Sequence, residues 1–181
     1  MKTARFYQRD GLCLFTPVAP LVTGYVMIAP VEHRQTPLMQ HPNHSLKRMI
    51  RDTLDALALT FENVWFFEHA SRNRDGTSCV PHSHLHLLPG VPPLELVQGS
   101  VQESAPSQVD IYIGTREATL GLSVPARSRQ HVRRAIAQAE FGLPLWDWRL
   151  HHHEPIYRAT EAILPRLAHH IGGFSLLTAS Q

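Results

Sequence analysis

Residues 82–89 read HSHLHLLP, and this alternation of histidine with mostly apolar residues constrains the fold more than any other feature of the chain. In a β-strand the side chains at positions i, i+2 and i+4 point to one face, roughly 6.5–7 Å apart per step. The pattern therefore predicts a strand with His82, His84 and His86 on one face and Leu85 and Leu87 on the other. Burying three imidazoles without partners is costly, so such a row is typical of a functional site.

The surrounding sequence predicts an α+β fold. Short apolar runs indicate strands at residues 12–15, 24–30 and 64–67, the first two forming a hairpin. A helix is expected from Asn43 or Ser45 onward. Apolar residues recur there at steps of three and four, on one face: Leu46, Met49, Ile50, Leu54, Leu57 and Phe61. We expect an antiparallel sheet that carries the histidine strand, with this one long helix packed across it.

A change of composition suggests how the chain is organised. Residues 91–108 are first proline-rich and then rich in glutamine and serine, which indicates a loop. We place a boundary there, between a core at residues 1–90 and a C-terminal extension at residues 91–181 that belongs to the same domain or packs closely against it. Four further elements are expected in the extension: strands at 109–113 and 119–124, and helices at 128–141 and 157–167.

Composition excludes several classes of protein. With 43% hydrophobic and 18% charged residues, the chain is an ordinary globular protein. The 17 Lys and Arg residues against 15 Asp and Glu give a charge of only +2, too little to indicate a nucleic-acid surface. No apolar run approaches the roughly 20 residues of a membrane span, and residues 1–5 do not lead into a signal-peptide core. Two cysteines favour a reducing compartment, so we expect a cytoplasmic location.

Three interpretations of the histidine row remain open. It could be a surface strand that happens to carry three histidines, although leucine-rich strands seldom do so. It could be a zinc, iron or copper site, since His-x-His on a strand is a common bidentate spacing, but no nearby carboxylate or fourth ligand is evident. The third interpretation is phosphoryl or nucleotidyl transfer by a nucleophilic imidazole.

Two segments in order resemble a known family. Residues 24–33, GYVMIAPVEH, precede the predicted helix, a strand and then residues 82–88, HSHLHLL. This arrangement resembles the histidine-triad (HIT) superfamily of nucleotide hydrolases and transferases, whose signature is His-φ-His-φ-His-φ-φ with φ apolar. The signature is met at every position except Ser83, and the resemblance covers about residues 5–90. It implies a HIT-like fold, a homodimer, and a reaction that requires no metal or other cofactor.

The resemblance also implies roles for the three histidines. His84 would be the nucleophile, because an imidazole with a pKa near 6.5 is mostly unprotonated at pH 7. His82 and His86 would orient it and donate hydrogen bonds to phosphate oxygens and to the leaving group. The implied reaction is hydrolysis at the α-phosphate of a dinucleoside polyphosphate or nucleoside phosphoramidate, through a nucleotidyl-histidine intermediate.

Further positions are assigned to substrate binding. Thr77 and Ser78 lie in the turn where HIT proteins contact phosphate, although an ordinary Asp-Gly turn explains the same residues. Tyr25 stands where many HIT hydrolases have a histidine, and His33 is interpreted as a surface residue. The third motif residue, His86, is glutamine in the uridylyl- and adenylyl-transferring branches, which favours hydrolysis over transfer.

The apolar pocket and the basic helix each have two interpretations. A base pocket is expected from apolar residues that are equally plausible in the core: Phe6, Leu14, Phe15 and Val26. Gln130 and Arg133, with Arg134, could bind polyphosphate oxygens, because the segment resembles the helix and the WDW tail (146–148) of long bacterial HIT proteins. The competing interpretation is a solvated basic helix face with Trp146 and Trp148 as core anchors.

Three alternative functions therefore stay open beside the hydrolase. One is a nucleotidyl transferase, and another is a metal-binding enzyme built on the histidine cluster. The third is a non-catalytic nucleotide-binding module, in which Tyr25 and Ser83 mark a site that has lost its activity. Covalent trapping of a nucleotide and metal analysis distinguish these alternatives.

Overall fold

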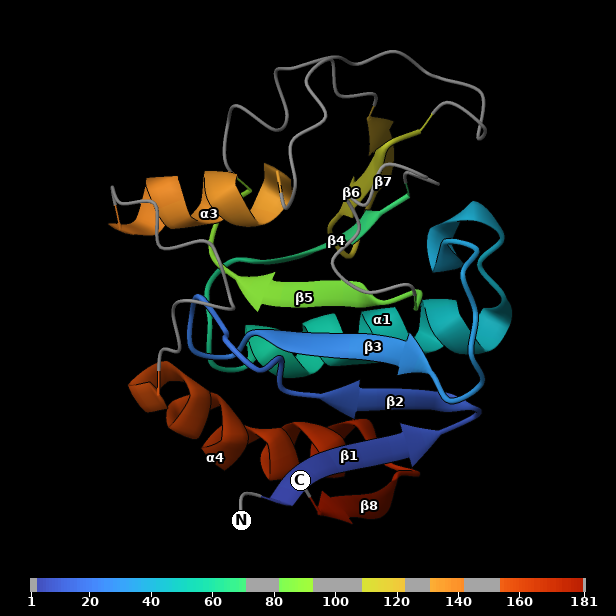
Figure 1. Ribbon diagram of the computed structural model, residues 1–181, viewed down its shortest axis with the longest axis vertical. Coiled ribbons are helices and arrows are strands. Elements are labelled where there is room, and N and C mark those ends of the chain that lie inside the picture. Colours follow the sequence, from blue (N-terminus) through green and yellow to red (C-terminus); the bar gives the residue numbers. More distant parts are fainter. Residues whose placement is uncertain (1–2, 71–81, 93–108, 123–130, 142–153, 181) are drawn as a thin grey trace.

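The computed structural model describes residues 3–70, 82–92, 109–122, 131–141 and 154–180. Within these ranges, eight strands form one antiparallel sheet in the order β7-β6-β4-β5-β3-β2-β1-β8. The strands are β1 (Thr3–Arg9), β2 (Leu12–Phe15), β3 (Val26–Pro30), β4 (Val64–His69), β5 (Leu85–Pro89), β6 (Ile111–Gly114), β7 (Thr119–Leu122) and β8 (Ser175–Ser180). The helices are η1 (Leu38–Gln40), α1 (His44–Ala58), α3 (His131–Phe141) and α4 (Glu154–Ile171). The predicted α+β class is confirmed (Figure 1).

Strands from the second half of the chain complete both edges of this sheet. The predicted pair β6 and β7 continues the sheet beyond β4, and β8 pairs with β1 at the other edge. Both β1 and β8 went unpredicted, because their sequences lack the apolar alternation that a half-buried strand shows. One continuous sheet therefore contains strands that precede residue 91 and strands that follow residue 108 in the sequence.

The helix α1 begins where the sequence predicts, because Asn43 caps it. The side-chain oxygen of Asn43 accepts a hydrogen bond from the amide of Leu46 at 2.8 Å, which satisfies one of the orphan donors of the first turn. Its apolar face packs on one face of the sheet (Figure 1), in a core with residues of β2, β3, β5 and α4. Leu14, Val26, Ile28, Leu85 and Leu87 are all fully buried in this core.

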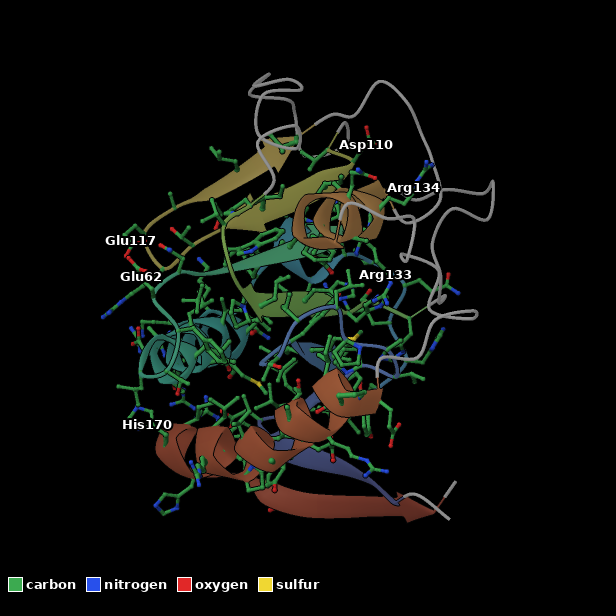
Figure 2. All side chains as sticks on the ribbon, turned by 90° about the vertical axis from the view of Figure 1, so that its left-hand side faces the viewer. Glu62, Asp110, Glu117, Arg133, Arg134 and His170 are labelled. Carbon is green, nitrogen blue, oxygen red and sulfur yellow. The ribbon has the colours of Figure 1, made fainter. Side chains whose placement is uncertain are left out.

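The opposite face of the sheet carries α3, and Figure 2 shows α1 and α3 on opposite sides of the sheet. Val132 and Ile136 of α3 pack there against Trp65 and Phe67 of β4. The helix was predicted from residue 128, but residues 128–130 lie outside the described part of the chain. Among the helices described, none is long and apolar enough to cross a lipid bilayer.

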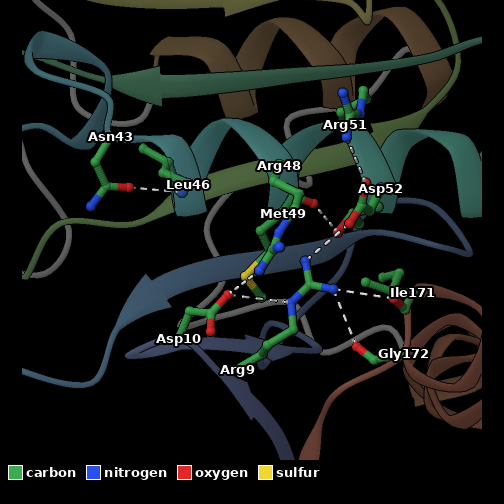
Figure 3. A network of polar contacts seen from close by, with 11 residues as sticks. Arg9, Asp10, Asn43, Leu46, Arg48, Met49, Arg51, Asp52, Ile171 and Gly172 are labelled. Carbon is green, nitrogen blue, oxygen red and sulfur yellow. Dashed lines mark hydrogen bonds and ion pairs between the residues drawn. The ribbon is translucent and has the colours of Figure 1, made fainter.

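Arg9 connects three parts of the fold that are distant in sequence (Figure 3). One guanidinium nitrogen donates to the carbonyl oxygens of Ile171 and Gly172, at 3.1 and 3.2 Å, where α4 ends. The other donates to a carboxylate oxygen of Asp52 in α1 at 3.1 Å. A cation placed at the C-terminal end of a helix also interacts favourably with its dipole. Arg9 therefore connects β1 to α1 and to α4, the two helices that share one core on the face of the sheet away from α3.

Candidate active site

The histidine segment enters the sheet later than predicted. The prediction that the strand begins at His82 is wrong, because β5 begins at Leu85 and only His86 of the three histidines lies within it. The neighbouring strand β3 pairs with β5 only as far as Ile28, which lies opposite Leu85, and its last two residues, Ala29 and Pro30, pair only with β2. The Pro30 carbonyl oxygen accepts a hydrogen bond from Nε2 of His82 at 2.9 Å. A side-chain contact thus replaces strand pairing at this point.

The ring of His84 is held by the backbone of the chain. Its Nδ1 lies 2.7 Å from the carbonyl oxygen of His82. Because a carbonyl oxygen can only accept, Nδ1 carries the hydrogen, and the lone pair of the neutral ring is on Nε2. Burial lowers the pKa of His84 below 6.5, an effect that the hydrogen bond to His82 opposes and the charge of His82 reinforces. His84 is therefore a neutral imidazole with Nε2 as its unprotonated nitrogen.

The ring of His86 lies between an aromatic plane and a phenol. It stacks on Phe67 with ring centroids 4.3 Å apart and planes at 10°. Its Nδ1 lies 2.7 Å from the hydroxyl of Tyr25, which is buried. Burial, and then the charges of His84, His69 and Arg133, lower the pKa of His86 well below 6.5. The ring is consequently neutral at pH 7 and fixed in orientation.

The three histidines are brought together, but through different contacts. The rings of His84 and His86 meet edge to face, with centroids 4.7 Å apart. The ring of His82 is turned toward Pro30 and toward His33, whose Nδ1 lies 3.2 Å from Nδ1 of His82. His82 thus reaches His84 through its backbone carbonyl. The sequence interpretation of His33 as only a surface residue missed this contact; its place three residues after the proline of β3 was the available signal.

Ser83, the departure from the expected pattern, has a structural explanation. It is buried, its amide donates to the carbonyl oxygen of Arg34, and its hydroxyl donates to the carbonyl oxygen of Thr36, both at 2.6 Å. A hydroxyl here provides a hydrogen bond that an apolar side chain would lose. Ser83 therefore fastens the histidine segment to residues 34–36.

The residues assigned to substrate binding are placed in part. Tyr25 lies against His86, and Arg133 of α3 is buried with its guanidinium donating to the carbonyl oxygen of Ala19 at 2.6 Å. The helix α3 lies near the histidines, because it packs in one cluster with Phe67, whose ring stacks on His86. The positive charge of Arg133 accordingly lowers the pKa of His86. Thr77, Ser78 and Gln130 lie outside the described residues.

A row of side chains crosses the sheet at His86. The strand registers pair Phe15 with Met27, Met27 with His86, and His86 with Phe67, so these four residues share one face. Phe15 and Met27 are partly buried. By contrast, Leu14 and Val26, which were expected in a base pocket, are fully buried in the core shared with α1, because alternate residues of a strand point to opposite faces. The side chain of Phe6 is not described.

The geometry also bears on metal binding. Among the residues that the structure describes, no group of three His, Cys, Asp or Glu side chains is arranged to hold a metal ion. Of the ring nitrogens of His82 and His84, Nε2 of His82 and Nδ1 of His84 contact carbonyl oxygens. In the neutral rings these two nitrogens carry hydrogen and cannot act as ligands.

Comparisons with known proteins find similarity among solved structures but not among sequences. No family model matches the sequence, and no curated protein matches it either. Among solved structures, the fold is similar to that of a HIT-like protein of Bartonella henselae, described as involved in cell-cycle regulation and crystallised with an unknown ligand. The two chains are 16% identical, the similarity covers 49% of this chain and 70% of that one, and the TM-score is 0.39.

Proposed function

We propose that this chain is a nucleotide hydrolase that acts at an α-phosphate through a nucleotidyl intermediate on His84. The observation that carries the proposal is the hydrogen bond from Nδ1 of His84 to the carbonyl oxygen of His82, at 2.7 Å. It leaves the lone pair on Nε2, so the ring needs no separate base before it attacks phosphorus. The lowered pKa of His84 keeps this form populated at neutral pH.

The proposed reaction has two displacements. In the first, Nε2 of His84 attacks the α-phosphorus, a P–N bond forms, and the bond to the leaving phosphate or amine breaks. The leaving group departs with the electron pair and takes up a proton. In the second, water attacks phosphorus, the P–N bond breaks, His84 regains its lone pair, and a nucleoside monophosphate and a proton are released. Dividing one difficult displacement in two lowers each barrier.

Neighbouring groups support these steps. The edge-to-face contact of His84 with His86 places a second neutral imidazole beside the reacting ring. The buried positive charge of Arg133 favours binding of an anionic phosphate near His86. We also assign phosphate contacts to Thr77, Ser78 and Gln130, following the resemblance to HIT proteins. Phe15 and Met27, in line with His86, are the apolar surface that we assign to the base.

The proposal includes the homodimer that the resemblance implies and the cytoplasmic location that the cysteine content favours.

The hydrolase function is tested by comparing the wild-type protein with His84→Asn, which keeps a hydrogen-bonding side chain but has no nucleophilic ring nitrogen. Dinucleoside polyphosphates and nucleoside phosphoramidates are the substrates. We expect release of nucleoside monophosphate by the wild type and a loss of at least about 10³-fold in the variant. Full activity of His84→Asn would overturn the proposal.

A further inference from the structure

Residues 31–40 form a segment that we call the strap, which follows β3 and ends with η1, three residues before α1. The strap holds the first half of the histidine segment at three points. The carbonyl oxygen of Arg34 accepts a hydrogen bond from the amide of Ser83, and that of Thr36 accepts one from its hydroxyl. The third point is His33, whose Nδ1 lies 3.2 Å from Nδ1 of His82. The carbonyl oxygen of His82 in turn fixes the ring of His84 by a hydrogen bond. A displacement of the strap would therefore move His82 and change the position of the His84 ring.

The far end of the strap is held by one buried carboxylate. Glu68 of β4 is 1% exposed, and its two oxygens accept the amides of Leu38 and Met39, each at 2.7 Å. These amides open the helical turn η1, whose N-cap residue, Pro37, has no side-chain oxygen to accept a hydrogen bond from them. Glu68 therefore supplies the cap that the strap's own sequence lacks.

We propose that Glu68 is a positioning residue for the histidine triad, acting through the strap that joins its carboxylate to His82 and Ser83. Leaving a buried amide without an acceptor is costly, so removal of the carboxylate releases the end of the strap. The loosened strap then frees Ser83 and the pair His33–His82. The effect on catalysis rests on the proposed function, whereas the effect on the strap does not.

The charged state of Glu68 determines the conditions of the test. Burial raises the pKa of Glu68 to about 7, whereas the two amide hydrogen bonds and the charge of Arg34 lower it. Tyr112 of β6 is paired with Glu68 in the sheet, and its pKa is raised by burial and by the charge of Glu68. Measurements at pH 8.5 therefore examine the carboxylate form.

The experiment measures amide hydrogen exchange by NMR in the full chain, comparing the wild type with Glu68→Gln. Glutamine has the same shape but only one acceptor oxygen, so one of the two amides loses its partner. The control is Glu62→Gln, which removes an exposed carboxylate just before β4 (Figure 2). We expect protection of Leu38, Met39 and Ser83 to fall at least tenfold in Glu68→Gln, with changed imidazole signals of His82, and to stay unchanged in the control.

Loss of protection confined to Leu38 and Met39, with Ser83 and His82 unchanged, would overturn the proposal, since Glu68 would then only cap η1. If Glu68→Gln does not fold, Glu68→Asp is measured in the same way. A smaller loss of amide protection that includes Ser83 supports the proposal, whereas a loss of protection that leaves Ser83 unchanged overturns it. With nucleotide substrate, kcat should fall about tenfold at unchanged KM. If the wild type itself has no activity, the proposed function fails while the exchange data still decide the role of Glu68.

Discussion

The Nδ1 atom of His84 lies 2.7 Å from the carbonyl oxygen of His82, so a backbone acceptor two residues away determines which nitrogen of His84 is free. The imidazole of His82 is not the group that orients His84, since it faces Pro30 and His33. Substitutions in this site should therefore change activity mainly by altering the position and the protonation of the histidine rings.

The activity should persist at mildly acidic pH. In the proposed reaction the neutral ring of His84 is the nucleophile, and its pKa in the folded protein is lowered below 6.5 by burial. The acid limb of kcat/KM should consequently have its midpoint below pH 6.5, because this limb reports the free enzyme's essential base. The neutral ring also stabilises the fold above pH 6.5, and this contribution is lost as pH falls through the folded-state pKa, since the unfolded chain binds the proton first. A midpoint at or above pH 6.5 would contradict this assignment.

Tyr25→Phe should impair catalysis more than it impairs folding. The change removes the hydroxyl 2.7 Å from Nδ1 of His86 but keeps the buried ring. We expect kcat to fall about tenfold and the free energy of unfolding to fall by about 1 kcal/mol, the usual worth of one hydrogen bond. Steady-state kinetics and urea unfolding measure the two effects. Tyr7→Phe in β1 is the matched control, and an equal loss of kcat there would argue against a specific role for Tyr25.

His33→Ala should reduce activity although the residue is exposed. The substitution removes the ring whose Nδ1 lies 3.2 Å from Nδ1 of His82. We expect a loss in kcat of about threefold to tenfold, corresponding to roughly 1 kcal/mol, and little change in thermal stability. The matched substitution His170→Ala, on the exposed surface at the end of α4, should leave kcat unchanged. Unchanged kcat in His33→Ala would show that the two rings are only neighbours.

Arg9→Met should destabilise the fold by about 2–3 kcal/mol without a direct effect on the site. The variant keeps much of the apolar stem but loses the hydrogen bonds to Ile171, Gly172 and Asp52, and hydrogen bonds to charged groups are the stronger ones. Arg51→Met is the control, because its ion pair with Asp52 is exposed and should contribute at most about 0.5 kcal/mol. Urea unfolding compares the two variants, and equal losses would contradict the role given to Arg9.

The sequence predicted those elements whose signals are local. The helix α1 and the pairs β2–β3 and β6–β7 follow from apolar periodicity, and the group of three histidines follows from its spacing. Contacts between distant segments left no such signal. The pairing of β1 with β8 and the cap that Glu68 provides to η1 both depend on tertiary placement. The strand start at Leu85 was missed because the alternation of histidine with apolar residues continues beyond the last β3–β5 pair, Ile28 with Leu85.

Trapping the covalent intermediate tests the central claim most directly. The wild-type protein is mixed with a nucleoside phosphoramidate or dinucleoside polyphosphate, quenched within milliseconds under alkaline conditions that preserve the P–N bond, digested and mapped by mass spectrometry. We predict one nucleoside monophosphate group attached at His84, present in the wild type and absent from His84→Asn. Turnover of substrate with no adduct at His84, or with the adduct on another residue, would contradict the account.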